Sequence, residues 1–316
     1  VLEFIGENFN TTRRVKATSP RIVHEDGKAA LAYTDLDGTK RFLDVSALYP
    51  SDPALLKKTQ ITHVAQAMRN KDLDYINWVI RAQVEAGATI IDICVDEISV
   101  DPDERHDWMR WIIPVAQEIT DLTLAIDSSD PNTIAAGLEV YDKSKSRPAV
   151  NSVNLEEGRQ QLIGLAKDHD ALLFANASGS DSMPANAEER VANLHQIMAM
   201  MDEGSIAMGD RYLDPLAFPI GAGSDFSRHY LDAVRTIREE FPEVHIFGGH
   251  SNTSFGLPQR RVMNNTFIIL SIIHGCDTLM IDPVLNLPKG FIEFKLANDA
   301  LMGRDEMCMR YMTHLR

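Results

Sequence analysis

The chain has 316 residues, of which 44% are hydrophobic, so it has enough apolar material for a large core. Its formal charge of −15 argues against binding to nucleic acid or to an anionic membrane surface, because both need basic residues. Three cysteines without a CxxC pair indicate neither a disulfide framework nor a structural zinc site, and we expect no bound metal. The sequence shows no signal-peptide pattern and no apolar run of membrane-spanning length, so we expect a soluble, cytoplasmic protein.

Short aliphatic runs alternate with amphipathic stretches of helical length along most of the chain. Strands are predicted at residues 2–6, 89–94, 122–127, 149–153, 171–176, 212–215, 245–249 and 278–282. Helices are predicted at residues 69–88, 108–120, 131–142, 155–169, 186–203, 229–241 and 258–275. The strand runs are continuously apolar, which is typical of a parallel sheet covered by helices on both faces. Eight such units predict a single α/β domain over residues 1–316, a TIM-type (β/α)8 barrel, with an open doubly wound sheet as the alternative.

One segment, residues 11–57, interrupts this alternation between the first strand and its helix. It contains two Asp-Gly turns flanked by β-forming residues, which favours a β-hairpin or a β-meander. Because it follows the first strand, we expect a β-rich insertion in the first βα loop, at the mouth of the barrel. Two interpretations remain. The segment is an insertion without a role in function, or it is a lid or a docking surface near the ligand.

Carboxylate and amide side chains stand at the ends of nearly all the predicted strands, where a TIM barrel builds its active site. They are Asp92, Asp127, Asn151, Asn176, Asp214, Asn252 and Asp282. A single residue of this kind can simply be a helix N-cap. We give this interpretation to Ser129 or Asp130 and to Asp282. A whole ring predicts a pocket rich in hydrogen-bond acceptors and poor in cations. Such a pocket suits a neutral heterocycle with several N–H donors, such as a pterin, and suits a phosphate poorly.

Several common catalytic motifs are missing from the sequence. There is no GxxxxGK[ST] phosphate loop, no GxSxG nucleophile elbow and no HExxH zinc motif. Of the ten histidines, His250 alone lies beside the predicted pocket. The chemistry is therefore expected to depend on positioning and electrostatics rather than on a covalent nucleophile.

Six motifs follow one another in the order of the predicted strand ends. They are GENFN (6–10), IDICVDE (91–97), LAIDSSDP (124–131), VNSVNLEEGR (150–159), YLDPLAFP (212–219) and SNTSFGLPQRRVMNNTF (251–267). Together they resemble the pterin-binding methyltransferase family, which includes methyltetrahydrofolate–corrinoid protein methyltransferases and the folate domain of cobalamin-dependent methionine synthase. The resemblance extends over the barrel but not over residues 11–57. It implies methyl transfer between N5 of tetrahydrofolate and a corrinoid, in one-carbon or demethylation metabolism.

The same resemblance implies roles for individual residues. It assigns Asp127, Asn151 and Asp214 to hydrogen bonds with the pterin ring. It places Asn252 near N5, where the methyl group is attached, and Asp92 in the network around that nitrogen, so these two are the expected catalytic residues. Arg260 matches an arginine of the last motif, and it is either solvent-exposed at the start of a helix or in contact with the anionic tail of the folate.

One position departs from the family pattern. Cys94 stands where family members often have asparagine, two residues after Asp92. A thiol is a weaker hydrogen-bonding group than an amide, so the network around N5 is expected to differ here. A buried, unreactive cysteine is the favoured interpretation.

The resemblance also implies partners and alternatives. No corrinoid-binding DxHxxG stretch is present, so methylcobalamin or another corrinoid must arrive free or on a separate corrinoid protein. A homodimer is expected by analogy with the family. The alternatives are an enzyme like dihydropteroate synthase and a non-catalytic folate-binding protein. The first is disfavoured because the DPLAFPIGAG loop (214–223) lacks the expected lysine and no clear pyrophosphate-binding Ser-x-Arg follows the last strand.

Overall fold

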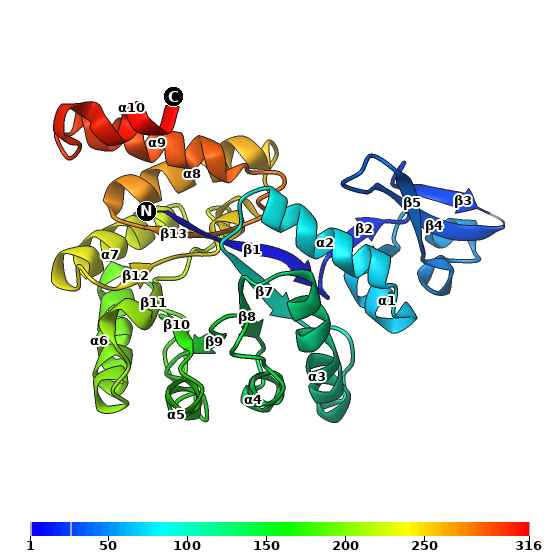
Figure 1. Ribbon diagram of the computed structural model, residues 1–316, viewed down its shortest axis with the longest axis horizontal. Coiled ribbons are helices and arrows are strands. Elements are labelled where there is room, and N and C mark those ends of the chain that lie inside the picture. The colour runs from blue at the N-terminus through cyan, green and yellow to red at the C-terminus, as the bar shows by residue number, and fades with distance from the viewer. Residues whose placement is uncertain (1, 26, 316) are drawn as a thin grey trace.

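The barrel is formed by eight parallel strands in a computed structural model that describes residues 2–25 and 27–315 (Figure 1). In spatial order they are β12 (His245–Ile246), β11 (Arg211–Asp214), β10 (Leu172–Asn176), β9 (Ala149–Val153), β8 (Thr123–Asp127), β7 (Ile90–Cys94), β1 (Glu3–Asn10) and β13 (Thr278–Ile281). A parallel bridge between Gly249 and Met280 joins the two ends of this order. The predicted TIM-type barrel is therefore confirmed, and the open doubly wound alternative is wrong.

Two strands, β1 and β12, differ in length from the prediction by more than one residue. β1 continues to Asn10, four residues beyond the apolar run that predicted it, and a register shift against β7 falls between Gly6 and Phe9. β12 ends after Ile246, because the chain then turns into a short 3-10 helix, η4 (His250–Ser254). The extra length of β1 carries the polar residues of the GENFN motif into the barrel mouth.

Helices surround the barrel, and an amphipathic pattern predicted most of them. They are α1 (His63–Asn70), α2 (Leu73–Glu85), α3 (Pro102–Ile119), α4 (Pro131–Glu139), α5 (Gln161–Asp168), α6 (Ala187–Glu203), α7 (Phe226–Glu240), α8 (Arg260–His274), α9 (Pro288–Leu301) and α10 (Met309–Leu315). Asp130 accepts a hydrogen bond from the backbone N–H of Asn132, so its predicted role as the N-cap of α4 is confirmed. Asp282 does not cap α9, which begins six residues later; it binds the backbone N–H groups of Val284 and Leu285 instead.

The chain between β1 and α1 is rich in strands, as predicted for the first βα loop. β3 (Ile22–Glu25), β4 (Lys28–Thr34) and β5 (Lys40–Asp44) form an antiparallel meander, and β2 (Arg14–Lys16) pairs with β6 (Gln60–Thr62). In Figure 1 the meander lies beyond α1 and α2, to one side of the barrel. Its Tyr33 ring packs against Tyr75 and Trp78 of α2, with centroids 4.9 and 4.8 Å apart. The insertion is therefore joined to the barrel through an aromatic cluster.

Among the residues that the structure describes, no helix is long and apolar enough to span a bilayer.

The last helices, α9 and α10, lie beyond the final helix that the sequence pattern predicted. They pack against each other at the C-terminal end of the chain (Figure 1).

Candidate active site

Strand alternation places the polar residues in one layer of the barrel interior. A lower interior layer is apolar and contains Ile5, Ile90, Ala125, Ala149, Phe174, Tyr212 and Phe247, with Met280 packed against it. Successive strand residues alternate between faces, so residues two positions later also point inward, nearer the carboxyl end of the barrel. They are Glu7, Asp92, Asp127, Asn151, Asn176, Asp214, Gly249 and Asp282. The predicted ring of acids and amides therefore follows from the two-residue period of each strand.

One side of this polar layer holds a coupled group of Asp92, Asn151 and Asp127. The Nδ2 of Asn151 donates to Oδ1 of Asp92 at 3.0 Å, and the Asp92 side chain is almost fully buried. Burial raises the pKa of Asp92 well above its ordinary value, the nearby Asp127 raises it further, and the Asn151 hydrogen bond opposes both. Burial and Asp96 likewise raise the pKa of Asp127. This side of the pocket therefore holds two acids whose charged forms burial disfavours, and the pKa of Asp127 is raised to about 7.

Cys94 belongs to this group as a thiol. It is buried, its S–H donates to the Asp127 carboxylate, and burial raises its pKa well above the ordinary value. A thiolate is the reactive form of cysteine, so the raised pKa makes this side chain inert.

Asp214 stands across the barrel from that group. Its Oδ1 accepts a hydrogen bond from the backbone N–H of Leu216 at 2.7 Å, and only 9% of the residue is exposed. Burial raises its pKa to about 7, against the opposing effects of Leu216, Arg190 and the backbone N–H of Gly249. A buried carboxyl that titrates near neutrality is a typical feature of a functional site.

Asn252 lies in η4, directly after the short strand β12. Its side chain is exposed, and its Nδ2 is close to Gly249, where an added Cβ would approach it to 3.1 Å. A side chain at position 249 would crowd the amide. Glycine at this point therefore leaves room for the Asn252 amide beside the end of β12.

Glu7 was given no role in the sequence analysis, although it lies in the GENFN motif. Burial raises the pKa of its carboxyl, while Arg13, a hydrogen bond from Ser251 and Arg260 lower it, and Asp282 raises it. Glu7 is therefore an acid between the η4 loop and the loop that follows β13. Its position two residues after the interior Ile5 was the signal available in the sequence, but the predicted strand ended at residue 6.

Arg260 is the first residue of α8, and it is exposed. Its Nε donates to Oγ of Ser254 at 3.0 Å, and its Nη2 donates to the carbonyl of Ser251 at 2.8 Å. These contacts hold the η4 loop that carries Asn252.

His250 of the same loop is fully buried against Tyr230 and Phe267, and burial lowers its pKa to about 4, so it is a neutral packing residue.

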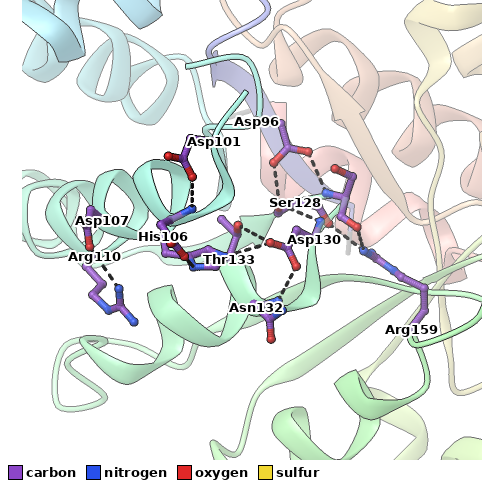
Figure 2. Close-up of polar contacts among 12 residues, drawn as sticks. Asp96, Asp101, His106, Asp107, Arg110, Ser128, Asp130, Asn132, Thr133 and Arg159 are labelled. Carbon is purple, nitrogen blue, oxygen red and sulfur yellow. Dashed lines mark hydrogen bonds and ion pairs between the residues drawn. The ribbon is translucent and has the colours of Figure 1, made fainter. Parts of the chain in front are cut away.

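Two buried arginines hold the loops that leave the polar layer. Arg159 donates to the carbonyl of Ser128 at 3.0 Å (Figure 2), to that of Ser129 at 2.7 Å and to that of Ser152. It thereby joins the residues that directly follow Asp127 and Asn151. Arg190 is completely buried and donates to the carbonyl of Leu216, two residues after Asp214.

A further set of hydrogen bonds orders the loop after β8 (Figure 2). Asp96 accepts from the hydroxyl of Ser128 at 2.6 Å and from the backbone N–H of Ser129 at 2.8 Å. His106 of α3 contacts Oδ2 of Asp130 at 2.9 Å. The polar layer is therefore supported from outside by contacts between neighbouring loops, which is what a preorganised site requires.

The fold and this layer of acids and amides at the carboxyl ends of the strands are those of an enzyme-type barrel. A family model described as pterin binding enzyme matches residues 62–282. The chain belongs to the pterin-binding enzyme family.

Two relatives connect the chain with methyltransferases. A methylcorrinoid:tetrahydrofolate methyltransferase of Eubacterium limosum is 31% identical over 256 residues, covering 80% of this chain and 91% of the relative. A methionine synthase of Mycobacterium tuberculosis is 27% identical over 254 residues, covering 75% of this chain and 20% of the relative. The chain therefore corresponds to nearly all of the first relative and to about a fifth of the second.

Solved structures of dihydropteroate synthases share the fold. The Yersinia pestis enzyme with a pterine-sulfa conjugate has a TM-score of 0.59 at 16% identity and covers 73% of this chain and 90% of its own. The Coxiella burnetii enzyme with pteroic acid has a TM-score of 0.53 at 13% identity and covers 70% and 86%. At these identities the similarity concerns the fold alone.

Proposed function

We propose that the chain is a methyltransferase that moves a methyl group between N5 of tetrahydrofolate and a corrinoid. The observation that carries this proposal is the layer of buried acids and amides around Asp92, Asn151 and Asp214, in a chain of the pterin-binding family. The relative that is 31% identical is a methylcorrinoid:tetrahydrofolate methyltransferase and is covered over 91% of its length. This similarity favours methyl transfer over other pterin chemistry.

The pterin ring would be held by Asp127, Asn151 and Asp214. A reduced pterin presents adjacent N–H and NH2 groups, and a carboxylate can accept both in parallel hydrogen bonds. Asp214 is a buried acceptor and Asp127 a half-buried one on a different strand, and Asn151 can donate to the pterin carbonyl or accept from an N–H. Asp214 would lose its proton when the pterin binds, because only the carboxylate form can accept the two parallel hydrogen bonds from the ring. A ligand without this pair of donors would not favour that deprotonation.

Asn252 and Asp92 would act on the reacting nitrogen. When the methyl group leaves N5, this nitrogen must gain a proton or a strong hydrogen bond as its bond to carbon breaks. In the opposite direction, N5 attacks the methyl carbon and its lone pair must be exposed. The Asn252 amide can donate or accept without changing charge, and Asp92 orients the network through Asn151. Their contribution is positioning and electrostatic stabilisation.

The corrinoid would be a second substrate, carried by a partner protein or free in solution. Asn252 is exposed, so the methyl group on N5 can be reached from outside the barrel. A homodimer that leaves this face open is compatible with the arrangement. The observations favour neither alternative function: the likeness to dihydropteroate synthases lies at 13–16% identity, and a non-catalytic binding protein would not need the exposed amide beside N5.

The test is an anaerobic assay of the purified chain with tetrahydrofolate and methylcobalamin, followed by visible absorbance and by detection of methyltetrahydrofolate. Enzyme-dependent loss of methylcobalamin with equal formation of methyltetrahydrofolate is the expected result. The assay is repeated with methylated corrinoid proteins in case free methylcobalamin is not accepted. Binding of tetrahydrofolate without methyl transfer from any corrinoid would support the non-catalytic alternative, and absence of binding would contradict the whole proposal.

A further inference from the structure

A positively charged cavity opens beside the polar layer, between the insertion and α2. It has a volume of about 360 Å³, within the range of small-molecule sites. Its lining includes Asn8, Arg13, Arg14, Arg21, Tyr75 and Asp282. We call it the arginine cleft. Three guanidinium groups face one carboxylate here, in a chain whose formal charge is −15, so the cleft is a local exception to the acidic surface.

The three arginines have different partners. Arg13 contacts Oδ2 of Asp282 at 2.7 Å and also donates to the Asn8 side chain, so it is held at the wall of the cleft. Arg14 is exposed and reaches only the exposed Glu97, at 3.7 Å, which is a weak surface pair. Arg21 is exposed at the beginning of the meander. Arg14 and Arg21 are therefore the groups that can turn to an incoming anion.

The wall opposite the arginines is aromatic and rigid. His63 contacts the Tyr75 hydroxyl through Nδ1 at 3.0 Å, and burial together with Arg13 and Arg21 lowers the pKa of His63 to about 3. The imidazole is therefore neutral and adds no charge. Tyr33 of the insertion fixes this wall by packing on Tyr75, and Arg41 of the insertion contacts Asp74 of α2 at 2.8 Å. These contacts hold the aromatic wall in place before a ligand binds, so only the exposed arginines have to be ordered on binding.

The cleft is continuous with the site proposed for the pterin. Asn8 follows Glu7 in β1, and Asp282 directly follows β13, so residues of β1 and of the end of β13 contribute to the polar layer and to the cleft. In the barrel β13 and β1 are the next strands after β12, which leads into Asn252. In a folate the tail leaves the ring at C6, the carbon bonded to N5. A ring with N5 at Asn252 can therefore direct its tail towards β13, β1 and the cleft.

We propose that the arginine cleft binds the glutamate carboxylates of the folate tail, an inference that rests on the proposed function. Arginine suits this ligand because its planar guanidinium can hold a carboxylate by two parallel hydrogen bonds. Arg260 contacts Ser251 and Ser254 and supports the loop of Asn252. The insertion thus adds a tail site that the barrel by itself lacks, and longer glutamate tails bind more tightly.

The experiment compares three ligands by anaerobic calorimetry: 6-methyltetrahydropterin without a tail, tetrahydrofolate with one glutamate, and tetrahydropteroyltriglutamate. We expect the double variant Arg14→Ala/Arg21→Ala to bind tetrahydrofolate about ten-fold more weakly and the triglutamate still more weakly. Binding of 6-methyltetrahydropterin stays unchanged. The control is Lys28→Ala, which removes a charge from an exposed residue of the same insertion that does not line the cleft. It should bind all three ligands like the unmodified chain.

The outcomes separate the two proposals. If the double variant binds the tailless pterin and the tailed ligands equally weakly, or binds the tailed ligands normally, the tail site is wrong. Neither result contradicts the proposal that the barrel binds a pterin. Failure of the unmodified chain to bind 6-methyltetrahydropterin and tetrahydrofolate contradicts the proposed function and the tail site together. Added potassium chloride is a second readout: it should weaken triglutamate binding to the unmodified chain more than to the double variant, because exposed charges are screened.

Discussion

The Nδ2 of Asn151 donates a hydrogen bond to Oδ1 of Asp92 at 3.0 Å, across two strands that are not neighbours in the barrel. β8 lies between them and places Asp127 beside the pair. Three adjacent strands thus bring two acids and an amide together, with Asp92 and Asn151 buried and Asp127 half-buried. The amide satisfies one acid and keeps its own oxygen available for a ligand.

Loss of the Asn151 amide should destabilise the ligand-free protein. Asn151→Ala leaves the buried Asp92 carboxyl without this donor, and we expect about 1–3 kcal/mol less free energy of unfolding in urea titration. Asn132→Ala is the control, since Asn132 is exposed, and its effect should stay within about 0.5 kcal/mol. Equal effects of the two variants would show that the Asp92–Asn151 bond contributes nothing to stability.

Asn252 and Asp214 should separate turnover from binding. Asn252→Ala is expected to lower kcat of methyl transfer with little change in pterin affinity, because the proposed function places the exposed amide beside N5. Asp214→Ala is expected to weaken pterin binding by about 1.5–3 kcal/mol, the usual contribution of a hydrogen bond to a charged group. Steady-state kinetics and calorimetry on both variants check this. Unchanged pterin affinity in Asp214→Ala would remove that residue from the site.

The raised pKa of Asp214 makes a prediction about pH. The ordinary pKa of this carboxyl is 3.8, and burial raises it to about 7 in the folded chain. The folded state therefore favours the protonated acid, so this contribution to stability is present below pH 3.8 and is lost as the pH rises through about 7. As the pH rises between these values, the free energy of unfolding of the unmodified, ligand-free chain should fall more than that of Asp214→Asn. If the free energies of unfolding of the two proteins change in parallel with pH, the raised pKa of Asp214 is contradicted.

Arg159 should act by positioning the loops of the site. Arg159→Ala leaves three carbonyls without their guanidinium donor, and we expect a loss of about 1–3 kcal/mol in free energy of unfolding together with weaker pterin binding. Arg228→Ala removes an exposed arginine that pairs with Asp225, and it should change neither quantity measurably. Pterin affinity that remains normal in Arg159→Ala would limit its role to stability.

The sequence by itself determined the barrel and most of its polar layer. Continuous apolar runs separated by amphipathic helices require a parallel sheet covered on both faces, and eight units close it. Because strand residues alternate between faces, Asp127, Asn151 and Asp214 had to point to the same side as the apolar residue two positions before each of them. The order of the six motifs then indicated the pterin-binding family, to which the chain belongs.

Only the tertiary structure decided which distant residues meet. The hydrogen bond from Asn151 to Asp92 joins residues 59 positions apart, and the ion pair of Arg13 with Asp282 joins residues 269 positions apart. No local pattern encodes such pairs, because they depend on the closure of the barrel and on the packing of the insertion against α2. The arginine cleft likewise forms only where residues of the insertion, α2 and the chain after β13 come together.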